Sequence, residues 1–405
     1  MAKALLPSSN GLEKRPKLRF PGFDEPYKQC RIGDIYAERS QRGASDMELL
    51  SVTMNDGVKP RSEIEGKDNS SEDKSNYKIV RKGDMVYNSM RMWQGANGIS
   101  PCDGIVSPAY TVLMPKQEIN NGYFAALFKS VTLINEFRKN SQGMTSDTWN
   151  LKYPQIETIK VQIPSVCEQD KVSELFSALD ERIVAQSQLV ESLKKYKRGL
   201  LFREFAPFAH DASDIEYEGK IHDFFSLSSG STPGSTNKAF YSGSIRWVSS
   251  GELKPKYLYE TNQHISSEAV SVCNLREYPA NTLLIAMYGL EAAGVRGTAS
   301  ILGVPSTISQ ACMAIQQTGE IDIEYFYYWY IYNGQWIGIR IAQGTKQQNL
   351  STDTLGNLKI NAPSLSKQKE VCKLLSHIDN RIEKENQNLD LLTSIKRGLL
   401  QQLFM

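Results

Sequence analysis

Two long stretches of the chain place apolar residues at alternating spacings of three and four, the pattern of a heptad repeat. Polar residues occupy the same stripe near the middle of both stretches, and polar seam positions fix the register of paired helices. Each helix could instead pack on its own head, but their equal lengths and matched polar centres favour mutual pairing. We therefore predict two long helices that pair as an antiparallel coiled coil. The predicted seam residues are Val172, Leu175, Leu179, Arg182 and Leu193 in the first helix and Val371, Leu374, Ile378, Arg381, Glu385 and Leu392 in the second.

The two stretches are copies of one segment. Shifting residues 164–205 by 199 positions places them over 363–404 with 17 of 42 residues identical and no gap. A repeat of this length is typical of a chain built from two copies of one supersecondary unit. We therefore interpret the chain as a tandem, in which each copy is a globular head followed by a long helix.

The heads are predicted to be mixed domains of strands and helices, since turn residues separate short apolar runs. The fold class is α+β, with two similar α/β heads, two long helices and an internal pseudo-two-fold repeat. The predicted boundaries are 1–163 and 210–362 for the heads and 164–209 and 363–405 for the helices. Strands are expected at 49–53, 77–88 and 110–114, then at 245–249, 282–287 and 311–315, with head helices at 123–137 and 323–332.

The aromatic run 325–330 could be a platform on which bases stack. It aligns at an offset of 202 with residues 123–128, which read as an ordinary apolar helix. Packing against a sheet is the commoner use of such a cluster. We therefore predict that the run belongs to the core of the second head.

Composition narrows the class of protein. Hydrophobic residues make up 40% of the chain and charged residues 23%, as in ordinary globular proteins. The net charge of +2 is too small for coating nucleic acid by charge alone. The six cysteines form no C-x-x-C pair, so neither a zinc site nor a disulfide framework is expected. No signal peptide or apolar run of membrane-spanning length is visible, and we expect a cytoplasmic protein.

The sequence lacks the motifs of a catalytic centre. It contains neither a G-x-x-x-x-G-K-[ST] phosphate loop nor a G-x-G-x-x-G segment after a strand. The triplet Glu252-Leu253-Lys254 has the form of a nuclease motif, but no acidic partner precedes it convincingly. We therefore expect no catalytic residues and no metal site in this chain.

Polar loops are the candidate binding residues, because two such loops occur at equivalent places in each head. Their amide, hydroxyl and basic side chains suit the edges of bases, where Asn and Gln pair with adenine and Arg or Lys with guanine. Each loop taken alone could be an ordinary solvated loop. Because polar loops occur at equivalent places in both heads, together they favour a binding surface. The candidates are Asn88, Ser89, Arg91, Gln94, Gln142, Thr145, Ser146 and Thr148 in the first head and Tyr288, Arg296, Gln343, Thr345, Lys346, Gln347, Gln348 and Asn349 in the second.

Three short motifs, each present twice, resemble those of the DNA-specificity subunits of type I restriction–modification enzymes. The loop 343–350 is also similar to one that closes the recognition domains of that family, whereas 142–150, with Met144-Thr145-Ser146-Asp147, departs from its usual form. The likeness covers the whole chain in order. The motifs are Pro164-Ser165-x-x-Glu168-Gln169-x-x-Val172, Leu179-Asp180-x-Arg182-Ile183 and Lys197-Arg198-Gly199-Leu200-Leu201, with their second copies.

This resemblance implies a function. The heads would be two target-recognition domains, each reading one half of a bipartite, asymmetric site in double-stranded DNA. The helices would act as a spacer and dock two methyltransferase (modification) subunits, with restriction and translocase subunits joining them. S-adenosylmethionine, ATP and Mg would then belong to those partners, and this chain would hold no cofactor.

Two other functions fit the residues. One is a duplicated coiled-coil adaptor that holds proteins together without binding DNA. The other is a DNA enzyme with a degenerate active site. Co-purification distinguishes the three, because only the specificity subunit would bind both a methyltransferase and duplex DNA while remaining inactive by itself.

Overall fold

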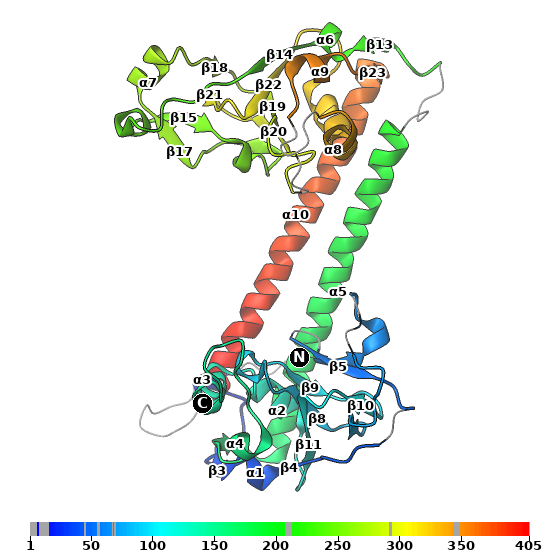
Figure 1. Cartoon of the computed structure of the whole chain (residues 1–405), viewed down its shortest axis with the longest axis vertical. Helices are drawn as coiled ribbons and strands as arrows, with labels where there is room; N and C mark the ends of the chain where they lie inside the picture. The colour runs from blue at the N-terminus through cyan, green and yellow to red at the C-terminus, as the bar shows by residue number, and fades with distance from the viewer. Residues whose placement is uncertain are drawn as a thin grey trace. The chain divides into compact units, whose positions relative to one another are not determined.

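The computed structural model describes residues 6–7, 16–43, 46–54, 57–66, 68, 70–206, 213–290, 294–342 and 349–404. The chain divides into two compact units, one comprising 1–188 and 386–405 and the other 189–385. Each unit therefore holds one head with a segment of each long helix (Figure 1). Both long helices, α5 (Val166–Phe205) and α10 (Leu365–Gln402), belong partly to one unit and partly to the other.

The first head is built on a four-stranded antiparallel sheet in the order β4-β11-β8-β9. The single strand predicted over 77–88 is two strands, because the chain turns at Gly83, whose φ is +91°. The single helix predicted over 123–137 is also two, α2 and α3, with Ser130 capping the second. The elements are β4 (Tyr36–Glu38), β7 (Lys78–Val80), β8 (Met85–Asn88), β9 (Asn97–Ile99), β11 (Tyr110–Pro115), α2 (Asn121–Leu127) and α3 (Val131–Asn140).

The second head repeats this sheet with an added strand, in the order β14-β22-β19-β20-β16. The predicted strands at 245–249, 282–287 and 311–315 correspond to β15 (Ile245–Val248), β19 (Leu283–Ala286) and β22 (Cys312–Gln317). The head helix α8 (Ile323–Arg340) continues beyond the predicted end at 332. Of the three predicted strands, β15 belongs to a separate sheet, and the other strands of the five-stranded sheet are β14 (Phe225–Ser229), β16 (Tyr257–Leu258) and β20 (Ala299–Leu302).

A strand-helix-strand unit opens both heads, and the last strand of each head returns to it. In the first head β12 (Lys160–Ile163) pairs antiparallel with β3 (Lys28–Arg31), which leads through α1 (Ile32–Ile35) into β4. In the second head β23 (Lys359–Ala362) pairs in the same way with β13 (Tyr217–Lys220), which leads through α6 (Ile221–Phe224) into β14. The predicted repeat therefore extends to strand topology.

In the part of the chain that the structure describes, no helix is both long and apolar enough to cross a membrane.

Smaller elements complete the two heads. The remaining strands and α-helices are β1 (Leu6–Pro7), β2 (Leu18–Arg19), β5 (Leu50–Thr53), β6 (Gly57–Pro60), β10 (Gly104–Val106), α4 (Tyr153–Ile156), β17 (Gln263–Ile265), α7 (Ser267–Val272), β18 (Glu277–Tyr278), β21 (Ser306–Ile308) and α9 (Thr352–Gly356).

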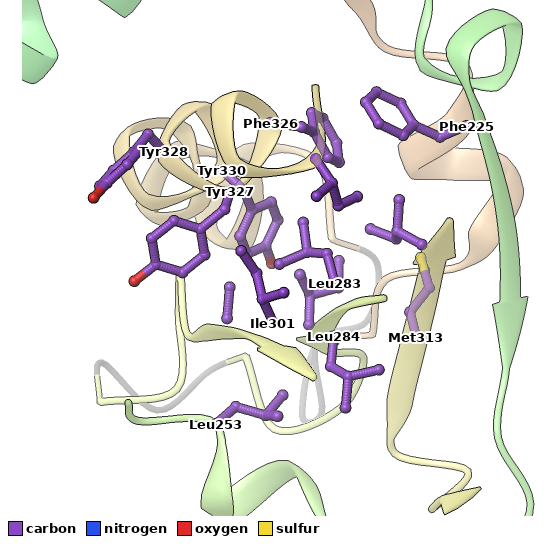
Figure 2. Packing of buried hydrophobic residues seen from close by; sticks show 14 of the residues in the cluster. Phe225, Leu253, Leu283, Leu284, Ile301, Met313, Phe326, Tyr327, Tyr328 and Tyr330 are labelled. Atoms are coloured by element: carbon purple, nitrogen blue, oxygen red, sulfur yellow. The ribbon is translucent and has the colours of Figure 1, made fainter. Parts of the chain in front are cut away.

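The aromatic run of α8 lies in the core of the second head, as the sequence indicates. Tyr325, Phe326, Tyr327, Tyr328 and Tyr330 are buried in the hydrophobic core that contains the main sheet. Figure 2 shows Tyr330 directed toward Leu283 and Ile301, whereas Tyr328 points away from them. The ring of Phe326 stacks on Phe225 with centroids 4.4 Å apart. The run is therefore unavailable as a base-stacking platform.

A glutamine ties the start of each long helix to its head. Gln169 donates from Nε2 to the carbonyl oxygen of Pro164 (3.0 Å), and its Oε1 accepts from the backbone N–H of Asn120, the N-cap of α2 (3.0 Å). Gln368 makes the same pair of bonds with Pro363 and Asp322, the N-cap of α8 (2.9 and 2.8 Å). Both glutamines are buried. This arrangement explains the repeated Pro-x-x-x-x-Gln spacing.

The far end of each long helix docks on the other head through an aromatic residue. Phe205, at the end of α5, packs on Tyr325 of the second head with ring centroids 5.1 Å apart. Phe404, just beyond α10, packs on Tyr123 of the first head at 5.4 Å and stacks on Phe176 at 5.7 Å. Each head therefore packs against the beginning of one long helix and the end of the other.

The buried stripe of the coiled coil follows the predicted seam with local shifts of one residue. Arg182, Leu374 and Arg381 were predicted in the seam but are exposed, and Leu374 is 41% accessible. The residues that follow them, Ile183, Leu375 and Ile382, are buried or half-buried instead. The buried or half-buried predicted positions are Val172, Leu175, Leu179, Leu193, Val371, Ile378, Glu385 and Leu392.

Polar residues occupy the middle of the buried stripe in both helices. Gln186 and its repeat counterpart Glu385 are each only 5% accessible. Within α10 the carboxylate of Glu385 accepts from Nε of Arg381, at 2.7 Å. The predicted polar layer is therefore present, although Arg381 reaches it from the exposed side of its own helix.

Two equivalent ion pairs join the long helices. Lys396 contacts Asp180 in the first unit, and Lys197 contacts Asp379 in the second, with Nζ 2.5 Å from Oδ1. In the second unit the hydroxyl of Tyr328 also donates to Oδ2 of Asp379 (2.8 Å). The ammonium of Lys256 lies 4.6 Å from the centre of the Tyr328 ring. The pairs are partly shielded from solvent, so they lose less strength to screening than fully exposed pairs do.

Candidate nucleic-acid interface

The two candidate loops of the first head lie side by side. The backbone N–H of Leu151, at the end of the loop 142–150, donates to the carbonyl oxygen of Ser89 (2.9 Å). Trp93 of the loop 88–94 packs edge-on against Trp149, with ring centroids 5.2 Å apart. The guanidinium of Arg138 lies 5.5 Å from the centre of the Trp93 ring. The loops are therefore held together by one backbone hydrogen bond and an aromatic pair.

The loop 142–150 is closed at its base by backbone hydrogen bonds. Gln142 and Asn150 exchange N–H···O bonds of 3.0 and 2.8 Å, and Gly143 has a φ of +144° that favours glycine. At the tip, the hydroxyl of Thr148 donates to the carbonyl oxygen of Thr145 (2.9 Å) and accepts from its backbone N–H (3.1 Å). The side chains of 142–148 are exposed, including Ser146. The result is an ordered projection with accessible polar groups.

The loop 88–94 places only some of its candidates at the surface. Arg91 and Gln94 are exposed, and Asn88 is half-buried, with its Oδ1 accepting from the backbone N–H of Met90 (3.0 Å). Ser89 is 3% accessible and its hydroxyl lies 2.8 Å from that of Thr111. The prediction that Ser89 contacts DNA is therefore wrong for its side chain, because the residue faces the interior beside the sheet.

The second head joins its two loops in the same way. The backbone N–H of Leu350 donates to the carbonyl oxygen of Met287 (2.8 Å), at the end of β19. Tyr288 follows directly and is 37% accessible. Asn349 is half-buried beside this junction. The other candidates of this loop, Gln343, Thr345, Lys346, Gln347 and Gln348, lie outside the described residues.

Arg296 has a structural role that the sequence did not reveal. Its Nε donates to the carbonyl oxygen of Leu290 (2.5 Å), and its side-chain carbons lie so close to Gly338 of α8 that a Cβ there would meet them at 2.8 Å. The neighbouring Gly297, with a φ of +73°, lies closer still to α8, since a Cβ at Gly334 would meet its Cα at 2.4 Å. Arg296 is half-buried and anchors the loop to α8 through Nε, and its contact with DNA stays a prediction.

Sequence reasoning missed the residues that hold the loops together. Trp93 and Trp149 are largely apolar and were not chosen as base-contacting candidates, and Arg138 lies in α3, outside both loops. The pairing of two tryptophans 56 residues apart depends on the fold. In the described ranges, no group of three or more His, Cys, Asp or Glu side chains could hold a metal ion. Glu252 uses its carboxylate to accept backbone N–H groups of Ser249 and Asn262 (2.9 and 2.6 Å), as a loop brace would.

The fold defines a two-headed protein, in which each head presents a joined pair of loops and is clamped to a long helix. The family model for the type I restriction modification DNA specificity domain matches residues 25–195 and again residues 213–394. The chain therefore belongs to the type I restriction–modification specificity family. The double match coincides with the internal repeat.

Similar proteins support the family and the fold. The MjaIX specificity subunit of Methanocaldococcus jannaschii is 27% identical over 190 residues, which are 46% of this chain and 43% of that protein. The EcoR124I/EcoR124II specificity subunit of Escherichia coli is 24% identical over 67% of this chain and 64% of its own length. These alignments thus span less than two thirds of both relatives. The MjaVIII specificity subunit of M. jannaschii is 23% identical over 80% and 79% of the two chains.

Solved structures show the same fold over nearly the whole chain. The S subunit of a type I restriction–modification system from M. genitalium superposes with a TM-score of 0.60 at 15% identity, covering 96% of this chain and 99% of that one. A chain from a study of assembly and conformational transition in the type I R-M system gives 0.61 at 13% identity, covering 93% and 97%. The predicted fold class, with two repeated heads and long paired helices, is confirmed.

Proposed function

We propose that the chain is a specificity subunit that reads a bipartite, asymmetric site in double-stranded DNA, with one head for each half. One observation carries this proposal: in each head two polar loops are joined by equivalent backbone hydrogen bonds, Leu151 to Ser89 and Leu350 to Met287. The scaffold is thus repeated while the side chains on it differ. A pair of unlike reading surfaces on like frames suits an asymmetric site.

The accessible side chains of the first head have the chemistry that base edges require. Arg91, Gln94 and Gln142 offer guanidinium and amide groups, which can pair bidentately with guanine and adenine in the major groove. Thr145, Ser146 and Thr148 add hydroxyl groups near the loop tip. In the second head Tyr288 and the loop 343–349 take the same role. In this proposal the heads, residues 1–163 and 210–362, act as the two target-recognition domains.

The long helices act as the docking surface for partner subunits. Two methyltransferase subunits would bind here, one to each repeat, and supply S-adenosylmethionine and the adenine methyltransferase site. Restriction and translocase subunits, with their ATP and Mg, would join that core. The chain itself neither methylates nor cuts DNA, and the absence of catalytic motifs in its sequence supports this division of labour.

The proposal is tested by reconstituting the chain with its methyltransferase subunit and mapping methylated sites by sequencing. Arg91→Ala with Gln94→Ala should relax the sequence of one half-site only, because a lost bidentate contact removes roughly 1–3 kcal/mol of discrimination. Alanine replacement of 343–349 should relax the other half only. Lys28→Ala, exposed on β3 and outside both loops and both long helices, serves as the control.

The outcomes separate the possible functions. Equal relaxation of both half-sites by either variant would show that the loops position the complex without reading bases. A complex that binds the methyltransferase but no duplex would favour a protein adaptor. Methyl transfer by the pure chain with S-adenosylmethionine would contradict the assignment of catalysis to a partner.

A further inference from the structure

A pocket of about 280 Å³, open to solvent on one side, lies in the first unit between α2, α5 and α10. Its apolar wall includes Ile99, Phe176 and Leu400, and its polar wall includes Asp180 and Lys396, which form one of the two repeated ion pairs. The α2 side is formed by small residues, among them Gly122, Ala125 and Ala126. A cavity of roughly 150 Å³ already admits a benzene ring in a protein interior. This space is therefore large enough for a single aromatic ring.

The internal repeat shows what stands at this place in the second unit. The bonds from Asn120 to Gln169 and from Asp322 to Gln368 fix α2 and α8 in the same register against the long helices. At that register Ala126 is the counterpart of Tyr328. The polar wall is repeated as well, since Asp180 corresponds to Asp379 and Lys396 to Lys197.

Tyr328 occupies this position in the second unit with a defined set of partners. Its hydroxyl donates to Oδ2 of Asp379 (2.8 Å), while Oδ1 of the same carboxylate pairs with Lys197. The ammonium of Lys197 lies 5.6 Å from the centre of the Tyr328 ring. Tyr328 is fully buried. The hydroxyl also accepts from Nζ of Lys256 (2.9 Å) and lies 3.2 Å from Oγ of Ser376. The second repeat therefore fills the space with a hydroxy-aromatic ring whose hydroxyl is bound by Asp379, Lys256 and Ser376, with Lys197 beside the ring.

We propose that the cavity beside Ala126 is a binding site for a hydroxy-aromatic ring supplied from outside the chain. The ring would lie against Phe176 and Leu400, and its hydroxyl would donate to Oδ2 of Asp180, as Tyr328 does to Asp379. Lys396 would stand beside the ring as Lys197 stands beside Tyr328. The ring can come from a tyrosine of a docked protein or from a free phenol, and the chemistry of recognition is the same for both.

The first experiment titrates the full chain with p-cresol, the side-chain analogue of tyrosine, by saturation-transfer NMR. Toluene, which lacks only the hydroxyl, is the matched ligand. A hydrogen bond to a charged acceptor predicts that p-cresol binds about tenfold more tightly than toluene or better. Ala126→Tyr should fill the cavity and abolish binding, whereas Asn135→Tyr, on the exposed face of α3, should leave it unchanged.

A second variant guards against a folding failure of the first. Asp180→Asn keeps the volume but removes the charged acceptor, so it should reduce the preference for p-cresol over toluene. Equal affinity for the two ligands, no binding of p-cresol, or p-cresol binding that survives Ala126→Tyr would each overturn the proposal. Adding the methyltransferase subunit then identifies the source, because displacement of p-cresol indicates a partner's tyrosine and continued binding indicates a free phenol.

Discussion

Lys197 and Asp379 form an ion pair whose two members recur, exchanged between the helices, as Lys396 and Asp180. Each lysine begins a copy of the segment Lys-Arg-Gly-Leu-Leu, and each aspartate lies in a copy of Leu/Ile-Asp-x-Arg-Ile. The two best-repeated segments of the helices are therefore partners of one another. Such reciprocal pairing favours a single register, because a slip along the helices would separate both pairs at once.

Reversing one charge of this pair should destabilise the second unit, and reversing both should restore it. Lys197→Glu places a second carboxylate beside Asp379 and should lower the thermal midpoint, while Lys197→Glu with Asp379→Lys should recover most of the loss. A partly buried charged hydrogen bond is worth about 1.5–3 kcal/mol. Differential scanning calorimetry measures the change, with the exposed Lys195→Glu as a control for added negative charge on α5. A double variant no more stable than the single one would contradict a direct pairing.

The two glutamine clamps should contribute strongly to stability. Gln169→Ala removes a buried side chain that makes two hydrogen bonds and leaves the carbonyl oxygen of Pro164 and the N–H of Asn120 without that partner. Each unsatisfied buried group costs about 1–3 kcal/mol. Urea unfolding should show an earlier midpoint for Gln169→Ala and Gln368→Ala, and little change for the exposed Gln188→Ala. Similar midpoints for all three would show that the clamps are unimportant.

Thiol reactivity should separate the cysteines by burial. Burial raises the pKa of the Cys312 thiol to about 12, so its thiolate fraction stays very small at pH 8, and the thiolate is the reactive form. Cys167 is exposed at the start of α5. Iodoacetamide at pH 8 followed by peptide mass spectrometry should modify Cys167 in the folded protein and Cys312 only after denaturation. Fast modification of Cys312 in the native chain would contradict its buried position.

Lengthening both helices by one heptad should change the spacing of the DNA site under the proposed function. Seven residues inserted after Gln186 and seven after Leu389 lie between the two ion pairs on both helices and preserve the heptad phase. Each insertion adds about 10 Å, the rise of roughly three base pairs. Methylation-site mapping should then show the same two half-sequences with a longer unread gap. An active variant with an unchanged gap would show that helix length does not set the distance.

The long helices were predictable, but their exact seam was not. Spacings of three and four identify the helices, yet polar residues such as Gln186, Lys197 and Lys396 interrupt the stripe. A seam predicted from the spacing of apolar residues alone then shifts to neighbouring positions. It includes Leu374, whereas the structure buries Leu375. The ion pairs that explain these polar positions join residues far apart in sequence, so a pattern along one helix cannot reveal them.

The repeat of the heads was only partly visible because the offset between them changes along the chain. It is 189 residues for β3 and β13, 198 for β8 and β19, and 202 for β11 and β22. Loops of unequal length cause these shifts. Candidate loops could be located from their place after equivalent strands, whereas the burial of Ser89 and the anchoring of Arg296 depend on contacts across the fold.

The pairing of β3 with β12, and of β13 with β23, places the entrance and the exit of each head next to each other. Neighbouring strands are about 4.8 Å apart, so the chain enters and leaves each head at neighbouring positions. Residues can be added or lost between the two paired strands of a head without displacing those strands or the long helix that follows them. Evolution can therefore change the surface of one head while the remainder of the molecule keeps its geometry.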